Sequence, residues 1–263
     1  MDTSQPVYNA IGKNYNVTRS ADPWIADKML SLLLPDKNGL FLDVGCGTGN
    51  YLEVFLDKGF KFYGVEPSEV MLSKAKVRCN TIIENVFVEQ LPFDDSFFNG
   101  ATAMFTFHHW KDKQKGLNEI FRVLKPGSRL IFLSFTPEQL FNYWHVHYFP
   151  KMIRRSAEIV PEKQEMISWL RTVGFSAVST ENYFVHDELT DHFFYSNKRR
   201  PEKYLDPEIR NGISSFTAFS DPDELKSGLI QLEKDIASGE IADIMKKYEN
   251  DIGDYIFYVA EKN

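Results

Sequence analysis

Apolar residues follow two different spacings along this chain. Between about residues 40 and 135, short apolar runs alternate with stretches in which apolar residues recur every three or four positions. The short runs predict buried strands and the longer spacing predicts amphipathic helices. The predicted strands, of which the third is the weakest, are 40–44, 61–65, 85–88, 101–107, 129–135, 177–185 and 255–260. Because strands that alternate with helices form parallel sheets covered on both faces, we predict an α/β fold.

Local signals predict where several helices begin and end. Asp22 followed by Pro23 is a capping residue before a proline at the first helical position. Ser68 is expected to cap a helix after the second strand, and Gly174 is expected to end a helix that begins near Pro161.

The alternation of strands and helices breaks after the fifth strand. Residues 137–160 are rich in aromatic side chains, and helical stripes fill most of the stretch between the last two strands. We therefore divide the chain into N-terminal lid helices (1–35), a cofactor-binding core (36–135), an aromatic lid segment (136–160), a helical insertion that forms a substrate lid (186–250), and two segments that complete the core sheet (161–185 and 251–263).

The net charge and the number of cysteines indicate which binding partners and which disulfide bonds are expected. The formal net charge is −7, whereas a protein that neutralises nucleic-acid phosphates needs a surplus of Lys and Arg. The short basic cluster Lys198-Arg199-Arg200 is typical of a solvated turn. Cys46 and Cys79 are too few for a disulfide framework. No signal-peptide pattern is visible, and no apolar run approaches the ~20 residues of a membrane span. We expect a cytoplasmic protein with neither a nucleic-acid nor a membrane partner.

The clearest chemical signal is the glycine-rich turn from Asp43 to Gly49 at the end of the first strand. Its glycines permit positive φ and let a ligand approach the backbone closely. The first amides of the following helix favour an anion, but Asn50 stands where a nicotinamide-binding turn usually has its third glycine. Asp43 would repel a pyrophosphate and suits a ligand with an ammonium and a sulfonium. Glu66, at the end of the second strand, can accept hydrogen bonds from both ribose hydroxyls. Together these acids favour S-adenosylmethionine over NAD.

Several motifs, in a fixed order, resemble those of class I S-adenosylmethionine-dependent methyltransferases. They are Phe41 to Gly49, Gly64-Val65-Glu66-Pro67-Ser68 with Met71-Leu72, Leu91 to Phe97, His108-His109-Trp110, and Glu119 to Gly127. The resemblance covers residues 8–135 well and 160–185 more loosely, and it is closest to the group related to ubiquinone and menaquinone methyltransferases. It implies a Rossmann-like, seven-stranded, mostly parallel sheet with helices on both faces and a partly helical lid. It also implies S-adenosylmethionine as cofactor and S-adenosylhomocysteine as product.

The resemblance further implies roles for matched residues. Gly45 and Gly47 would line the methionine part of the cofactor, and Asp43 would organise its amino group. Cys46 and Gly49 of the same turn are further cofactor-binding candidates. Glu66 would hold the ribose, with Pro67 beside it, and Met71 would pack on the adenine. Thr106 would offer its carbonyl to the amino group. Tyr15 and Arg19 match a tyrosine and an arginine near the N-terminus of many such enzymes, where the guanidinium can meet the cofactor carboxylate.

One position departs from the family pattern. The family often has an acid that reads the adenine amino group where this chain has Phe87. Either Glu89 takes over that contact, or packing and backbone around Phe87 and Val88 hold the ring.

Methyl transfer from a sulfonium is a direct in-line displacement, which needs mainly alignment and exclusion of water. A general base is needed only if the acceptor carries a proton, and His109 and His108 are the candidates.

We expect no metal site, because nothing completes the pair His145 and His147. Ligands of parallel sheets bind beyond the carboxyl ends of the strands, where three lid segments would enclose a largely apolar pocket for a small molecule. Candidate substrate-binding residues are Trp110, Tyr143, Trp144, His147 and Arg199.

Three alternatives stay open at this point. The chain could act on a protein or RNA, although its net acidity and bulky lid count against both. It could bind S-adenosylmethionine without turnover. A nicotinamide oxidoreductase would instead be stabilised by NAD. The sequence names neither the methyl acceptor, nor the accepting atom, nor the oligomeric state.

Overall fold

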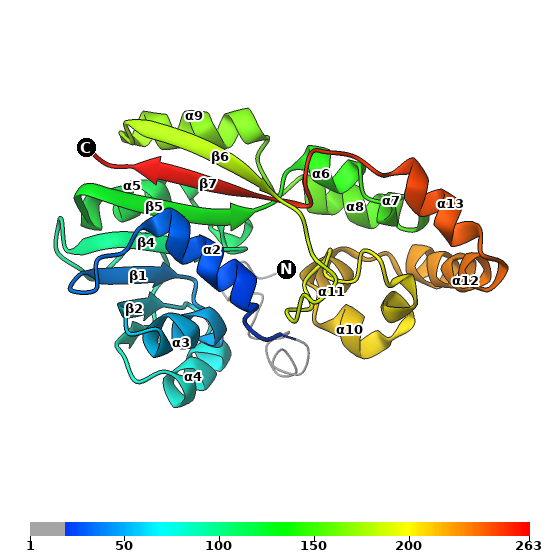
Figure 1. Ribbon diagram of the computed structural model, residues 1–263, viewed down its shortest axis with the longest axis horizontal. Coiled ribbons are helices and arrows are strands. Elements are labelled where there is room, and N and C mark those ends of the chain that lie inside the picture. Colours follow the sequence, from blue (N-terminus) through cyan, green and yellow to red (C-terminus); the bar gives the residue numbers. More distant parts are fainter. Residues whose placement is uncertain (1–18) are drawn as a thin grey trace.

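The computed structural model describes residues 19–263, which form two lobes side by side (Figure 1). Over these residues, seven strands form one sheet in the order β3-β2-β1-β4-β5-β7-β6. Strand β7 is antiparallel to both of its neighbours, and the remaining pairs are parallel. The strands are β1 (Leu40–Val44), β2 (Lys61–Val65), β3 (Ile83–Glu84), β4 (Phe98–Met104), β5 (Leu124–Ser134), β6 (Ala177–Tyr183) and β7 (Tyr255–Glu261). The predicted α/β sheet is therefore confirmed.

Two strand predictions need correction. The prediction of a strand over 85–88 is wrong, because β3 ends at Glu84 and the chain then turns into a loop. The side-chain amide of Asn85 donates to the main-chain oxygen of Glu66 at 2.9 Å, which holds this loop against the end of β2. Strand β5 begins at Leu124, earlier than predicted, because Leu124 already pairs with Phe98 before an irregularity in the register.

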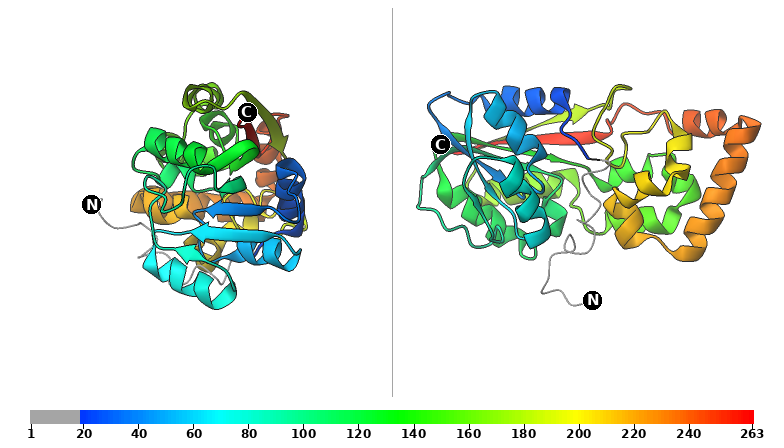
Figure 2. Two further views of the ribbon diagram at one scale, coloured as in Figure 1. Left: turned by 90° about the vertical axis from the view of Figure 1, so that its left-hand side faces the viewer. Right: turned by 90° about the horizontal axis from the view of Figure 1, so that it is seen from below.

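Helices cover both faces of the sheet (Figure 2). On one face lie α2 (Pro23–Leu33), α3 (Asn50–Asp57) and α4 (Glu69–Arg78), and on the other lie α5 (Lys113–Val123) and α9 (Lys163–Val173). Since side chains alternate along a strand, Phe41 packs with the first set of helices and Leu42 with the second. The sheet is thus buried on both faces, and only its ends remain for a ligand.

The predicted helix caps are present. The Asp22 carboxylate accepts from the Ile25 amide at 3.1 Å, and the Ser68 hydroxyl accepts from the Met71 amide at 3.4 Å. Helix α9 ends at Gly174, which adopts a left-handed φ of 119°. The assignment of residues up to 35 to a lid is wrong for α2, because this helix packs on the sheet and its buried face belongs to the core.

The second lobe is helical and lies beyond the carboxyl ends of the parallel strands, where β5 ends and β7 begins (Figure 1). It contains α6 (Pro137–Phe141), α7 (His145–Tyr148), α8 (Pro150–Ala157), η3 (Pro201–Leu205), α10 (Pro207–Asn211), α11 (Ser214–Phe219), α12 (Pro222–Ser238) and α13 (Glu240–Lys247). Its two chain segments pack as one unit, because the Trp144 indole donates to the Lys198 carbonyl at 3.0 Å and the hydroxyls of Tyr143 and Tyr204 lie 2.9 Å apart. Over residues 19–263, no helix has the length and apolar character needed to cross a bilayer.

Candidate active site

The glycine turn links the end of β1 to the start of α3. The amides of Gly45 and Cys46 donate to the Val65 carbonyl at 2.8 and 3.1 Å, which fixes the turn beside β2. Gly45, Gly47 and Gly49 all have positive φ, as the sequence predicts. The turn therefore depends on a backbone conformation that other residues adopt only at a cost.

The three glycines have different surroundings. A Cβ on Gly45 would lie 2.2 Å from the Thr106 hydroxyl oxygen, and one on Gly49 would lie 2.8 Å from the Cys79 sulfur. Both positions are closed by the protein itself. Among the described residues, a Cβ on Gly47 would meet only the Met71 methyl, at 4.0 Å, and would project into a space above the turn that these residues leave open. Gly47 is therefore the glycine that lets a ligand approach the backbone.

Two buried carboxylates flank the turn. Asp43 is 5% exposed and accepts from the Thr102 hydroxyl at 2.8 Å. Glu66 is 6% exposed and accepts from the amides of Gly47 at 3.0 Å and Ser68 at 2.8 Å. Burial raises the pKa of Asp43 to about 6 and that of Glu66 to about 7, against the smaller effects of these hydrogen bonds. Buried carboxylates of this kind suit a ligand that brings hydrogen-bond donors and positive charge.

The side expected to hold adenine is lined mainly by apolar side chains. Met71 is buried, Pro67 and Phe87 are half-buried, and Val88 is buried. Glu89 accepts from the amides of Lys111 and Asp112 at 2.7 and 3.0 Å, both through Oε1, which anchors its carboxylate at the start of α5. Its second oxygen, Oε2, makes no hydrogen bond with the described residues, so Glu89 stays a candidate for the adenine contact beside the packing around Phe87 and Val88.

Thr106 follows β4 and covers the turn. Its hydroxyl oxygen accepts from the Trp110 indole at 3.3 Å, and its carbonyl accepts from the His109 amide at 2.9 Å. Arg19 lies on the same side of the molecule, where its guanidinium pairs with the buried carboxylate of Asp191. Tyr15 lies outside the described residues.

The two candidate bases occupy the short helix η2 (Phe107–His109) after β4. Their ring centroids lie 3.9 Å apart. Burial holds the pKa of His108 well below its usual range and, with a smaller contribution from Lys113, lowers that of His109 to about 4. Both imidazoles are therefore neutral at pH 7. Among the described residues, His108 Nδ1 is buried without a hydrogen-bond partner.

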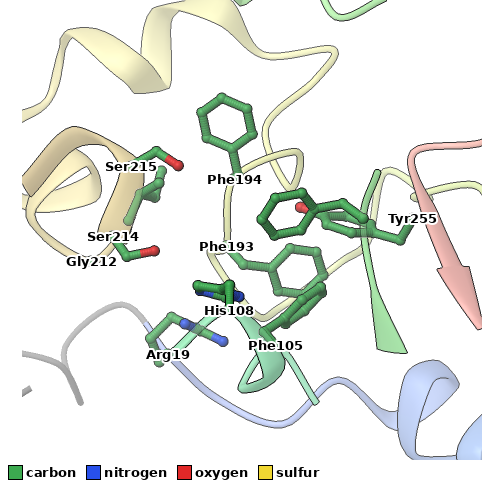
Figure 3. Close-up of a pocket in the computed structure, with 11 residues that line it drawn as sticks. Arg19, Phe105, His108, Phe193, Phe194, Gly212, Ser214, Ser215 and Tyr255 are labelled. Carbon is green, nitrogen blue, oxygen red and sulfur yellow. The ribbon is translucent and has the colours of Figure 1, made fainter. Parts of the chain in front are cut away.

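A pocket opens beside this helix, between the sheet and the helical lobe (Figure 3). Its floor comes from the ends of β4 and β5 and the start of β7, and its far wall comes from the lobe. Most of its lining is aromatic, and the polar members include one cation and one histidine. The lining residues are Arg19, Phe105, His108, Phe135, Phe193, Phe194, Gly212, Ile213, Ser214, Ser215 and Tyr255.

Of the predicted site residues that lie within 19–263, this acceptor-side pocket brings together only Arg19 and His108. Tyr143 and Trp144 are 2% and 1% exposed in the core of the lobe, so neither is placed to contact a ligand. Trp110 packs against Phe107 and Phe132 in the core of the sheet lobe. His147 is exposed on α7, and the exposed Arg199 pairs with Asp187 at 2.7 Å.

The sequence reasoning missed the residues that do line this pocket. Phe105 and Phe135 directly follow β4 and β5, and Phe193 and Phe194 stand in the aromatic triplet Phe193-Phe194-Tyr195. Aromatic residues at strand ends and in an otherwise polar loop were the available signal. No group of three or more His, Cys, Asp or Glu side chains suited to a metal occurs over residues 19–263.

Arg122, in the sequence motif from Glu119 to Gly127, has a structural role. Arg122 on α5 donates to the carbonyls of Leu91 and Phe93 at 3.0 and 2.7 Å and pairs with Asp95 and Glu119. It therefore holds the loop before β4 in place rather than contacting a ligand.

This sheet order, with one antiparallel strand, an acid before a glycine turn and a second acid after β2, is the arrangement of class I S-adenosylmethionine-dependent methyltransferases. Residues 42–132 match the model of a family described as a methyltransferase domain. This part of the chain is therefore similar to that family. The open approach above Gly47 and the buried acids Asp43 and Glu66 fit S-adenosylmethionine, the cofactor of that class.

Individual relatives carry related names. The ubiquinone/menaquinone biosynthesis C-methyltransferase of Vibrio parahaemolyticus is 32% identical over 163 residues, which are 51% of this chain and 63% of that protein. The demethylmenaquinone methyltransferase of Clavibacter sepedonicus is 29% identical over 54% of this chain and 67% of its own length. A putative methyltransferase from an antibiotic biosynthesis pathway of Anabaena variabilis superposes with a TM-score of 0.83 and 29% identity, covering 92% of this chain and 98% of that one. The chain thus spans less than two thirds of the first of these relatives.

Proposed function

We propose that this protein transfers the methyl group of S-adenosylmethionine to a small-molecule acceptor bound in the pocket of Figure 3. The observation that carries the proposal is that one short segment serves both sites. Thr106 covers Gly45 of the cofactor turn, while its neighbours Phe105 and His108 line the pocket. An acceptor in this pocket would therefore lie next to the cofactor.

The character of the pocket supports a small and largely apolar acceptor. Aromatic walls bind flat apolar surfaces, and a few polar groups orient the ligand. Arg19, the cation in the lining, is paired with the buried Asp191 carboxylate, so the pocket carries little net charge from this pair. Its enclosure between two lobes and the net charge of −7 both argue against a nucleic-acid acceptor.

The residues of this chain would contribute alignment, exclusion of water and a proton acceptor. Alignment of the acceptor with the methyl group is the main requirement of an in-line displacement, and it can supply roughly 7–11 kcal/mol of the barrier. If the acceptor atom carries a proton, His108 is better placed than His109 to take it, because both imidazoles are neutral but only His108 of the two lines the pocket. The cofactor supplies the methyl group and its leaving group.

The test separates cofactor binding from turnover. Isothermal titration with S-adenosylhomocysteine should show binding, and NAD should show none. Glu66→Gln should weaken the binding by tenfold or more, whereas Asp235→Asn, at a buried carboxylate of the helical lobe, should not. Incubation of a metabolite extract with methyl-labelled cofactor, followed by mass spectrometry, should then reveal a labelled small molecule.

Each contrary result has its own meaning. Equal binding of S-adenosylhomocysteine by Glu66→Gln and wild type would refute the cofactor site. Label found only in protein or RNA would refute a small-molecule acceptor. Binding without label transfer to any fraction would favour a non-catalytic binding protein.

A further inference from the structure

A buried polar junction joins the helical lobe to the start of α3. Asp191, 1% exposed, accepts hydrogen bonds from Nε and Nη2 of Arg19 and, at 3.2 Å, from the Tyr51 hydroxyl. The Tyr51 oxygen in turn accepts from the Asp22 amide at 3.2 Å. Arg19 and Asp22 precede α2, Tyr51 belongs to α3, and Asp191 lies in the loop after β6. Three segments that are far apart in the chain therefore meet at one carboxylate.

The same junction reaches the cofactor turn through the main chain of Arg19. The Arg19 carbonyl accepts from the side-chain amide of Asn50 at 3.2 Å. Asn50 is the first residue of α3 and directly follows Gly49, the last glycine of the turn. Arg19 is thus bonded to the lobe through its side chain and to the start of α3 through its backbone.

On its other side the junction reaches the acceptor pocket. Phe193, two residues after Asp191, forms part of the pocket wall, with its ring 5.0 Å from Phe105 and 4.9 Å from Tyr255. The Arg19 guanidinium lies 5.8 Å from the Phe193 ring and beside His108 (Figure 3). Movement of Asp191 would therefore move both the wall and the guanidinium.

A buried ion pair is a poor means of adding stability, because desolvation offsets most of the attraction. Apolar residues of similar volume would hold the two lobes together equally well. A charged pair with two hydrogen bonds instead fixes the relative orientation of its partners, because a guanidinium donates to a carboxylate in only a narrow range of orientations. This junction is thus suited to setting the position of the lobe.

We propose that Asp191 is a positioning residue that holds the wall of the acceptor pocket in a defined position relative to the cofactor turn. The proposal rests on the proposed function, because it takes the glycine turn as the cofactor site. The helical lobe then takes part in cofactor binding. A ligand on the glycine turn stabilises the position of the lobe, and a lobe held in that position strengthens the binding of the ligand. Such coupling between two sites is reciprocal.

The experiment measures this coupling with S-adenosylhomocysteine as the probe. Hydrogen exchange of the segments around Phe193 and Ile213 is followed with and without the ligand, and affinity is measured by titration calorimetry. The test variant is Asp191→Asn, which keeps the size of the side chain and removes its charge. The matched control is Asp235→Asn, because Asp235 is also buried, at 4% exposure, and accepts from a tyrosine hydroxyl, that of Tyr148, at 3.0 Å.

In wild type, the ligand should slow exchange at both lobe segments although neither belongs to the turn. Asp191→Asn should lose most of this protection and bind the ligand about fivefold or more weakly. Asp235→Asn should keep both properties. If Asp191→Asn does not fold, Tyr51→Phe removes one hydrogen bond to Asp191, together with the one from the Asp22 amide, and should lose part of the protection, whereas Tyr148→Phe should lose none.

Equal behaviour of the Asp191 and Asp235 variants, or of the two tyrosine variants, would overturn the proposal. Wild type that binds the ligand without protection of the lobe would overturn it as well. Wild type that does not bind the ligand at all would instead refute the proposed function, so the two failures are distinguishable.

Discussion

Gly47→Ala provides a sharp test of where the cofactor lies. Gly47 has a φ of 59°, so an alanine there would adopt a left-handed conformation, at a cost of about 1–2 kcal/mol. The added methyl would meet only the Met71 methyl, at 4.0 Å, and would clash with no other part of the described protein. The variant should therefore fold, with a melting temperature lower by about 2–8 °C.

The effect on ligand binding should be much larger than the effect on folding. The new methyl projects into the space through which the cofactor must approach the turn. At 100 times its dissociation constant, S-adenosylhomocysteine should stabilise wild type by about 2.7 kcal/mol. That stabilisation raises the melting temperature by about 5–10 °C in a protein of this size. Gly47→Ala should lose most of this rise.

The control is Gly239→Ala, between α12 and α13. Gly239 has a φ of 84°, and a Cβ there would meet nothing within 4 Å. The cost of placing an alanine at positive φ is therefore similar at Gly239 and Gly47. Gly239, however, lies between α12 and α13 of the helical lobe, whereas the turn lies between β1 and α3. Differential scanning fluorimetry with and without ligand compares the three proteins. If Gly47→Ala kept the full ligand-induced shift, or if Gly239→Ala lost it equally, the ligand would not lie above Gly47.

Three further predictions follow from the site and its supports. Burial raises the pKa of Glu66 from 4.5 to about 7, so the folded state binds more protons than the unfolded state between these values and loses stability as pH rises through that window. Urea unfolding should therefore show Glu66→Gln gaining about 2–3 kcal/mol relative to wild type between pH 4.5 and 7.5, and a constant difference would contradict the burial argument. With a proton-bearing acceptor, His108→Gln should slow labelled-methyl transfer by about 10²-fold or more while His109→Gln has a smaller effect, and equal losses would count against the assignment of the base. Arg122→Met should cost about 1–3 kcal/mol in urea unfolding, because it removes partly buried hydrogen bonds to two carbonyls, yet it should leave S-adenosylhomocysteine affinity unchanged in calorimetry.

The cofactor side of the site could be predicted because its signals are local. Positive φ at Gly45, Gly47 and Gly49 follows from a strand that must turn at once into a helix, and Asp43 and Glu66 stand at strand ends that a parallel sheet brings together. The sequence alone could not show that the three glycines differ. That difference depends on Thr106 and Cys79, which reach the turn only in the folded protein.

The acceptor side was harder to predict because aromatic residues serve equally well as core and as pocket lining. Tyr143 and Trp144 fill the core of the lobe, whereas Phe193 and Phe194 face the pocket, and no spacing in the sequence separates the two cases. Arg19 was a candidate from its position. Its partner, Asp191, is 172 residues away, a contact that only tertiary structure reveals.

The position of β7 between β5 and β6 has a consequence for how the protein is made. Within the part of the chain that the structure describes, strand β6 pairs only with β7, so on the ribosome it has no partner there until residues 255–261 have been synthesised. The ribosome adds about 5–20 residues per second, so the roughly 70 residues between β6 and β7 take several seconds to synthesise. During that time the whole helical insertion is synthesised, while β6 and β7, the strands at its two ends, are not yet paired. We expect the nascent chain to need protection in this interval, because an unpaired strand beside an incomplete sheet is a template for pairing with other chains.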